Sequence, residues 1–453
     1  MHSHLDLFAY VLLVIGLMTL FALIGRALAK HFGQPTVVGE LLIGVVIGNI
    51  GYWFGVPAFV AIMHLNELGE ILRSFIATGA LPWPAVAELS AQQATPTPIS
   101  QFMIGEDAAQ TYVFAGALWL FANLGVVFLM FTAGLGSSIG KLNSVRGPAV
   151  AVGIVGVLLP VLLGFVAMTY LLPETDVILR LFVGATLAAT SVGVSASVFD
   201  ELGVTSSRPA SIVLGAAVID DILAMVLLAT VMGVVVSGVI DYWEIATILL
   251  LATGFLGFIV IAGDRLVKLG IPLFERLDRL HVKLLYAIFV LCVISILANA
   301  LGLAIIVGAF AAGLLLRDEY FHTGESRPIK ELIAPLEIIL APVFFVLIGM
   351  QVNLQSVLSL DTLALIGVLT VAAVIGKLAA GFAATGESSR LAIGVGMIPR
   401  GEVGIIFAGI GNAAGLFSTE QFTAIVIVIF ATTVIAPVAL KTCFSRWPPL
   451  ESL

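Results

Sequence analysis

The sequence predicts an all-α polytopic membrane protein with about thirteen transmembrane helices. Of its 453 residues, 60% are hydrophobic and only 11% are charged. A soluble domain carries about 25% charged residues, so this composition excludes a soluble globule. The apolar residues also come in long runs, and a membrane-spanning helix needs roughly 20 of them. The chain is therefore expected to cross a bilayer many times.

The expected helices follow one another along the chain in thirteen apolar ranges. These are 6–27, 36–56, 114–136, 148–171, 178–199, 209–237, 245–263, 283–300, 302–316, 332–350, 361–385, 391–414 and 420–441. Arg26 and Lys30 follow the first apolar run and nothing basic precedes its core, so it reads as a retained helix and not as a signal peptide.

The distribution of basic residues predicts the orientation. With the N-terminus outside, sixteen Lys and Arg residues fall on the inner side and two on the outer side, while Lys377 and Arg400 lie within expected helices. Lys and Arg concentrate in cytoplasmic loops. We therefore expect an external N-terminus and a cytoplasmic C-terminus.

The thirteen helices divide into a single transmembrane domain with two repeats. We expect a leading helix at 1–35, a five-helix repeat at 36–237, linker helices at 238–301 and a second five-helix repeat at 302–442. Because five is odd, the second repeat enters the membrane from the opposite side, as in many secondary transporters. An external insertion, residues 51–113, follows the second helix.

Two helices at matching places in the repeats contain interruptions. The fifth carries the polar, glycine-bearing stretch 190–195, and the twelfth carries Gly394, Pro399 and Gly401. Glycine and proline weaken helices, so we expect two crossed discontinuous helices here. The carbonyls that an interruption exposes can coordinate a cation, while Arg400 and Glu402 offset the half-helix end charges.

Two adjacent carboxylates, Asp220 and Asp221, lie within the otherwise apolar sixth helix. A charge near the bilayer centre costs at least ~2.5–3.5 kcal/mol, so an ion or proton path is the default interpretation. Lys377, within the eleventh helix, needs a partner for the same reason. Structural alternatives remain open at this point. The aspartates could cap a helix break, Lys377 could reach a helix end, and Thr190 and Ser191 could bond to the preceding turn.

Several segments together carry a family resemblance. They are GQPTVVGE (33–40), ATSVGVS (189–195), GAAVIDDI (215–222), GAFAAGL (308–314), PVFFVLIG (342–349) and GMIPRGEVG (396–404). The chain thereby resembles the cation:proton antiporter-2 family, in its NapA-like branch. The resemblance implies a NapA/NhaA-like fold, a homodimer, and Asp221 as the main ion ligand and proton carrier. It further implies that Asp220 pairs with Lys377, and that the Asp-Asp form exchanges ions electrogenically.

A competition for one carboxylate explains how such a protein would work. Asp221 can hold a proton or help to hold Na+, but not both at once. Hard cations take oxygen ligands, so we expect Na+ at Asp221, Thr190 and Ser191, with Asp220 joining when Lys377 releases it. Glu40 and Glu402 are expected in coupling or structural roles.

The expected function is therefore exchange of Na+ or Li+ for H+ in pH homeostasis, and not enzyme catalysis. A K+/H+ antiporter or K+ efflux transporter is the alternative within the family. An intramembrane aspartyl protease is the distant one, and it is disfavoured because adjacent aspartates point about 100° apart.

We expect monovalent cations, protons and the lipid bilayer as partners, and neither a cofactor nor nucleic acid. The expected location is a bacterial inner membrane, with a photosynthetic (thylakoid) membrane as the alternative. Because the sequence stops shortly after its last expected helix, we expect no C-terminal nucleotide-binding domain.

Overall fold

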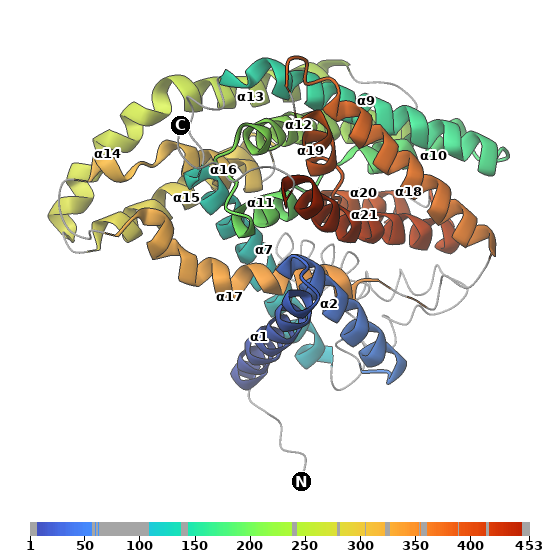
Figure 1. Ribbon diagram of the computed structural model, residues 1–453, viewed down its shortest axis with the longest axis horizontal. Helices are drawn as coiled ribbons and strands as arrows, with labels where there is room; N and C mark the ends of the chain where they lie inside the picture. The colour runs from blue at the N-terminus through green and yellow to red at the C-terminus, as the bar shows by residue number, and fades with distance from the viewer. Residues whose placement is uncertain are drawn as a thin grey trace, which may run out of the picture.

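The structure of the protein is a computed structural model. It describes residues 7–56, 59, 62, 108–136, 144–237, 242–278, 281–303, 305–321, 327–352, 354, 360–387, 389–413 and 416–445. All regular elements within these ranges are helical, which confirms the predicted fold class (Figure 1). Most of the expected external insertion at 51–113 lies outside the described residues.

Apart from one additional helix at Asp264–Leu277, the α-helices occupy the ranges that the sequence predicts. In chain order they are α1 (Leu7–His31), α2 (Thr36–Trp53), α7 (Ala108–Leu135), α9 (Arg146–Leu171), α10 (Val177–Ala188), α11 (Val192–Glu201), α12 (Arg208–Ser237), α13 (Tyr242–Phe258), a π-helical segment η1 (Ile259–Gly263), α14 (Asp264–Leu277), α15 (Val282–Ala300), α16 (Ile305–Leu315), a 3-10 turn η2 (Asp318–Tyr320), α17 (Ile329–Met350), α18 (Leu360–Gly381), α19 (Arg390–Gly396), α20 (Glu402–Ala413) and α21 (Thr419–Ser445).

Each of the thirteen expected ranges contains a helix or a pair of helices. Within the described residues, nine helical segments are long and apolar enough to cross a membrane. That all thirteen cross stays a prediction. Helix α14 is an addition to the predicted helices, because its charged sequence predicts a loop between two spans.

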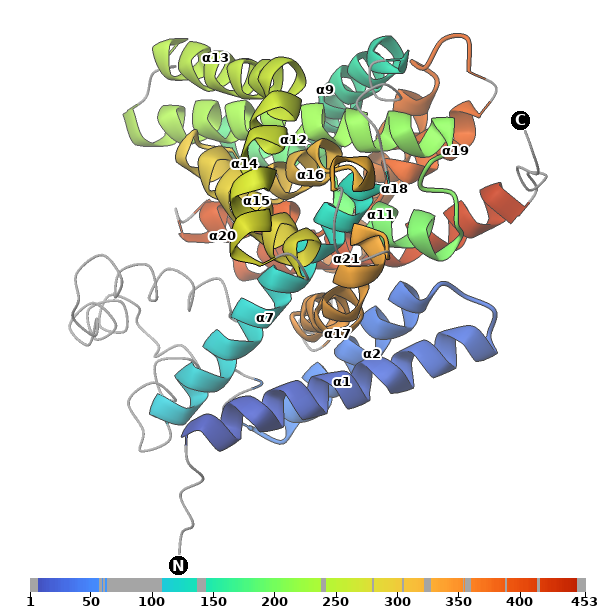
Figure 2. The same cartoon turned by 90° about the vertical axis from the view of Figure 1, so that its left-hand side faces the viewer.

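Most of the helices pack in two groups. A scaffold group consists of α1, α2, α7, α16 and α17, which contact one another in the pairs α1 with α2, α2 with α17, α7 with α17, and α7 with α16. A core group consists of α9 to α12 and α18 to α21, with α9 packed against α10, α12 and α18. Figure 2 shows α1, α2 and α17 lying along one side of the core group.

Pairs of glycines allow two close helix crossings in the scaffold group. A Cβ atom on Gly44 of α2 would lie 2.3 Å from the Val346 carbonyl oxygen and 3.0 Å from Gly349 Cα on α17. A Cβ atom on Gly134 of α7 would likewise lie 2.3 Å from a carbonyl oxygen of α16 and 3.0 Å from Gly313 Cα. Small residues let membrane helices approach this closely. The two crossings therefore have matching geometry.

The fifth and twelfth expected helices are interrupted where the sequence indicates. Residues 189–191 separate α10 from α11, and residues 397–401 separate α19 from α20. At the end of α10 that lies away from the interruption, the Asp176 carboxylate accepts a hydrogen bond from the Ile178 amide (3.2 Å) and caps the N-terminus of the helix. Gly203, at φ +69°, follows the end of α11 in the left-handed conformation that glycine favours there. The half-helices thus have defined ends.

Replacing Gly44 by alanine is expected to destabilise the protein. The added methyl would overlap the α17 backbone, and overpacking of this kind costs about 1–3 kcal/mol. Gly367 of α18 is the matched control, because nothing lies within 4 Å of its Cβ position. Melting temperatures in detergent measure the difference. Equal melting temperatures for Gly44→Ala and Gly367→Ala would contradict the close crossing.

Candidate ion-binding site

Hydrogen bonds across the two interruptions hold the half-helices together. The Ser191 amide donates to the Pro399 carbonyl (2.8 Å). The Thr190 hydroxyl donates to the Met397 carbonyl (3.4 Å), and the Ser195 hydroxyl donates to the Gly396 carbonyl (2.6 Å). The Thr190 hydroxyl therefore reaches across to the other broken helix, and the alternative that it bonds to its own preceding turn is wrong.

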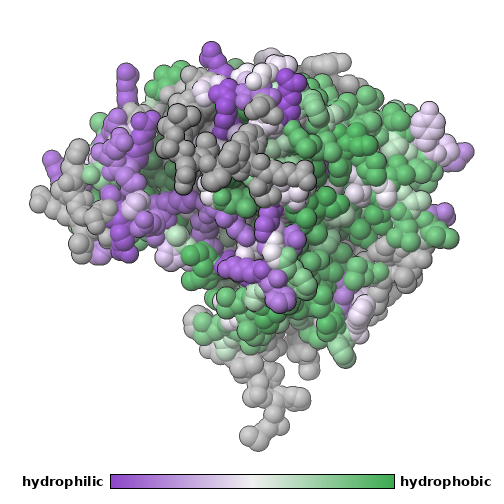
Figure 3. All heavy atoms as spheres, viewed as in Figure 1, coloured by the Kyte–Doolittle hydropathy of each residue, from purple (hydrophilic) through white to green (hydrophobic). Residues whose placement is uncertain are grey.

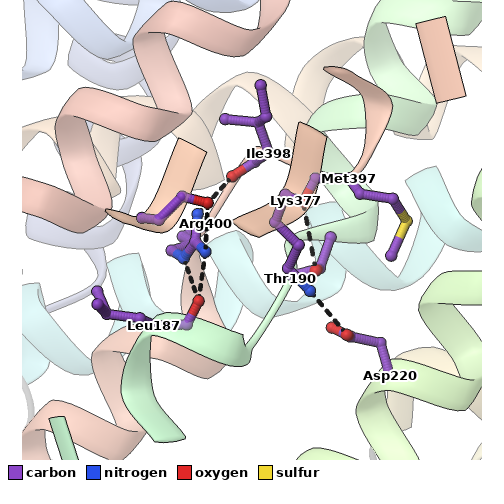
Figure 4. A network of polar contacts seen from close by, with 8 residues as sticks. Leu187, Thr190, Asp220, Lys377, Met397, Ile398 and Arg400 are labelled. Carbon is purple, nitrogen blue, oxygen red and sulfur yellow. Dashed lines mark hydrogen bonds and ion pairs between the residues drawn. The ribbon is translucent and has the colours of Figure 1, made fainter. Parts of the chain in front are cut away.

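Arg400 caps one of the half-helices. Its guanidinium is completely buried and donates to the carbonyls of Leu187, Ile398 and Ala373, with Nε–O 2.7 Å at Leu187, Nη1–O 2.9 Å at Ile398 and Nη2–O 3.3 Å at Ala373 (Figure 4). Leu187 lies in the last turn of α10, where carbonyls lack helical partners and the helix dipole is negative. Arg400 thus satisfies and neutralises this end, as the sequence predicts.

Asp220 and Lys377 form a buried ion pair. Lys377 Nζ lies 2.8 Å from Asp220 Oδ1, and neither side chain has any exposed surface. Asp220 comes from α12 and Lys377 from α18, and Thr190 lies beside the pair (Figure 4). A lysine that extended to a helix end would be exposed, so that alternative is wrong. The expected partners are brought together.

Asp221 follows directly on α12 and is also buried, with 3% of its surface exposed. It lies near enough to Lys377 to interact with it electrostatically. Because consecutive residues of a helix point about 100° apart, Asp221 does not duplicate the position of Asp220. The two carboxylates therefore have different surroundings, and the direct contact with Lys377 belongs to Asp220.

Glu40 lies apart from this cluster. Its carboxylate is buried and accepts a hydrogen bond from Arg26 Nε at 2.5 Å. The pair lines a cavity of about 190 Å³ bordered by α1, α2, α11 and α17, whose lining includes neither Asp220 nor Asp221. Glu402 begins α20, but its side chain lies outside what the structure describes.

The structure adds residues that the sequence analysis did not assign to the site. The Ser195 hydroxyl joins the half-helices, and the Thr433 hydroxyl of α21 donates to the Arg400 carbonyl. Ser195 is a hydroxyl residue in a mostly apolar stretch, which is a usable signal. The role of Thr433 depends on how α21 packs against the interrupted helices, so no local sequence pattern indicates that role.

Buried, paired charges beside two crossed, interrupted helices define the class: an ion-transporting membrane protein, whose site lies at the helix breaks. The family described as "Sodium/hydrogen exchanger, transmembrane" matches residues 17–446. The chain belongs to this family of transmembrane sodium/hydrogen exchangers.

Individual relatives agree with this membership. The chain is 34% identical to the high-affinity Na(+)/H(+) antiporter NhaS3 of Synechocystis over 93% of its own length and 87% of that protein. It is 32% identical to the Na(+)/H(+)-K(+) antiporter GerN of Bacillus cereus, over 95% of each chain. Its fold resembles the sodium proton antiporter MjNhaP1 of Methanocaldococcus jannaschii, with a TM-score of 0.58 at 16% identity over 97% of this chain and 98% of that chain.

Removing Lys377 is expected to destabilise the protein strongly. Lys377→Ala leaves Asp220 as a buried charge without its cation, and breaking a buried pair in this way costs about 3–5 kcal/mol. The double variant Asp220→Asn/Lys377→Ala removes both charges and should recover part of the loss. Melting temperatures in detergent provide the measurement.

Lys30→Ala is the matched control, because Lys30 is an exposed lysine of α1. Exposed substitutions usually change stability by no more than about 0.5 kcal/mol. If Lys377→Ala melts at the same temperature as Lys30→Ala, the pair does not hold the core group together.

Proposed function

We propose that the protein is a secondary active antiporter that exchanges Na+ or Li+ for H+ across its membrane. The observation that carries this proposal is the buried Asp220–Lys377 pair beside Asp221 and the crossing of two interrupted helices. The names of its relatives support the same substrates, since NhaS3 and GerN are both Na(+)/H(+) antiporters.

Competition for Asp221 would couple the two ions. Low polarity around the carboxylate favours its protonated form, whereas a nearby Na+ favours the ionised form. Within the described residues, no group of three or more His, Cys, Asp or Glu is placed to hold a metal. The remaining Na+ ligands would be oxygens of Thr190 and Ser191 at the interruption, because a hard cation takes oxygen ligands.

Asp220 would regulate how much charge moves. While Asp220 is paired with Lys377, the lysine ammonium balances its negative charge, and Asp220 needs neither a proton nor Na+. When Lys377 loses its proton, Asp220 can join the Na+ ligands, and the exchange then moves more than one proton per Na+. This makes the exchange electrogenic.

Alternating access would come from the core group moving against the scaffold group. The glycine crossings of α2 with α17 and of α16 with α7 support an inverted repeat, because each joins the first helix of one repeat to the second helix of the other. In this arrangement the scaffold group would form the contact between two copies in a homodimer. The charge distribution supports a cytoplasmic C-terminus, and a bacterial inner membrane is the proposed location.

Replacing Asp221 by asparagine is expected to abolish exchange, because the asparagine side chain cannot take up and release a proton as a carboxylate does. The assay uses purified protein in proteoliposomes with an imposed proton gradient, and records its dissipation after addition of Na+. Asp361→Asn is the matched control, since Asp361 is an exposed aspartate at the start of α18. Undiminished Na+-dependent exchange by Asp221→Asn would rule out this residue as the carrier.

The same assay distinguishes the cations. We expect Na+ and Li+ to dissipate the gradient and to generate a membrane potential. A response to K+ alone would assign the protein to K+/H+ exchange, and a response without a membrane potential would exclude the proposed electrogenic coupling.

A further inference from the structure

Helix α14 differs from the other helices of the linker because it presents three distinct faces. Val267, Ile271 and Phe274 form one face, which packs against the protein. A second face carries exposed leucines at spacings of three and four residues, which place them on one side of a helix. These are Leu266, Leu269, Leu273 and Leu277, which are 49%, 79%, 59% and 75% exposed.

The orientation of α14 is fixed by its contact with α15. Tyr286 of α15 donates a hydrogen bond from its hydroxyl to the Val267 carbonyl (2.6 Å). Gly270 lies against the same ring, so closely that a Cβ atom there would be 2.4 Å from the Tyr286 hydroxyl oxygen. The Phe274 ring packs edge-on against Tyr286, with centroids 4.9 Å apart. Because the helix cannot rotate without breaking these contacts, its leucines stay exposed.

Basic residues border the leucine face. Arg265 and Arg276 are exposed and lie next to the leucines on the helical surface. Lys268 lies on the polar face, where its ammonium group is 4.5 Å from the centre of the Tyr320 ring. In Figure 3, hydrophilic residues gather on the side of the molecule where α14 lies in Figure 1, opposite the hydrophobic side formed by α9, α10 and α18.

We propose that α14 lies in the membrane interface and binds anionic phospholipid, with its four leucines among the acyl chains and Arg265 and Arg276 at the phosphates. An amphipathic helix of low net hydrophobicity with basic residues beside its apolar face has the pattern of interfacial helices. Basic residues near a membrane surface attract anionic lipids. The location agrees with the positive-inside orientation, which places α14 between two spans on the cytoplasmic side.

The position of the leucine face can be measured with fluorescent labels. In a background where Cys292 and Cys443 are replaced by serine, single cysteines replace Leu269 or Lys268 and carry an environment-sensitive fluorophore. The protein is reconstituted in phosphatidylglycerol vesicles that contain either lipid with a spin label on the acyl chain or iodide in the aqueous phase. We expect the label at Leu269 to be quenched several-fold more by the spin-labelled lipid, and the label at Lys268 to be quenched more by iodide.

Two results would overturn this placement. Quenching of the Leu269 label by iodide and not by lipid would mean that the face is in water. Protection from both quenchers would mean that protein covers it, as in a contact with a second copy of the chain.

The preference for anionic lipid is tested separately by thermal stability. Detergent-solubilised protein is melted with added phosphatidylglycerol or phosphatidylcholine. We expect phosphatidylglycerol to raise the melting temperature by a few degrees more than phosphatidylcholine, and this difference to disappear in Arg265→Gln/Arg276→Gln.

The control Arg146→Gln/Arg390→Gln removes the same charge from the first residues of α9 and α19. It should keep the preference for phosphatidylglycerol. The proposal is wrong if the wild type shows no such preference, if the α14 variant retains it, or if the control loses it equally.

Discussion

The arrangement of the core group depends on the burial of one ion pair, Asp220 with Lys377. Removing two charges from water is costly, and their attraction compensates for this only when the geometry is good. Three helices provide that geometry. Asp220 and Lys377 project from α12 and α18, and α9 covers them at Gly156, where a Cβ atom would be 3.5 Å from Lys377 Nζ and 3.7 Å from Asp220 Oδ1. The pair therefore constrains how α9, α12 and α18 pack.

The helix breaks beside the pair follow the same electrostatic rule. An interruption inside a membrane exposes carbonyls and amides that water cannot reach, so each needs a partner within the protein. The Arg400 guanidinium donates hydrogen bonds to the Leu187 carbonyl at the end of α10. The hydroxyls of Thr190 and Ser195 donate to carbonyls at the end of α19. Arg400 thus brings its positive charge both to the end of α10 and to the Ile398 carbonyl just after α19, while neutral hydroxyls bond the last carbonyls of α19.

The sequence predicted most of this arrangement because its main signals are local. Apolar runs located the helices, and glycine and proline located the interruptions at 189–191 and 397–401. The burial of Asp220 and of Lys377 indicates that each needs a partner of opposite charge. The family resemblance indicates that the two pair with each other. The sequence predicts that Arg400 offsets the charge of a half-helix end, but it does not identify the acceptor, because Leu187 is 213 residues away in the chain. Its three carbonyl acceptors are set by how the helices cross.

Other features required the folded structure. The sequence predicts a coupling or structural role for Glu40, but it indicates Arg26 only as a basic residue at the inner end of a helix and not as the partner of Glu40. The charges of α14 resemble those of a loop, and only its leucine spacing indicates a helix. Both cases show that residues at the ends of membrane helices are poorly specified by hydropathy. Their partners come from neighbouring helices.

The central claim is that Na+ and H+ compete for Asp221. Titration calorimetry of Na+ binding to the purified protein tests it most directly, when repeated in buffers of different ionisation enthalpy. The account predicts that Na+ binding releases protons, so the measured enthalpy changes with the buffer, and that both binding and release are lost in Asp221→Asn. Na+ binding whose enthalpy is independent of the buffer would contradict the claim.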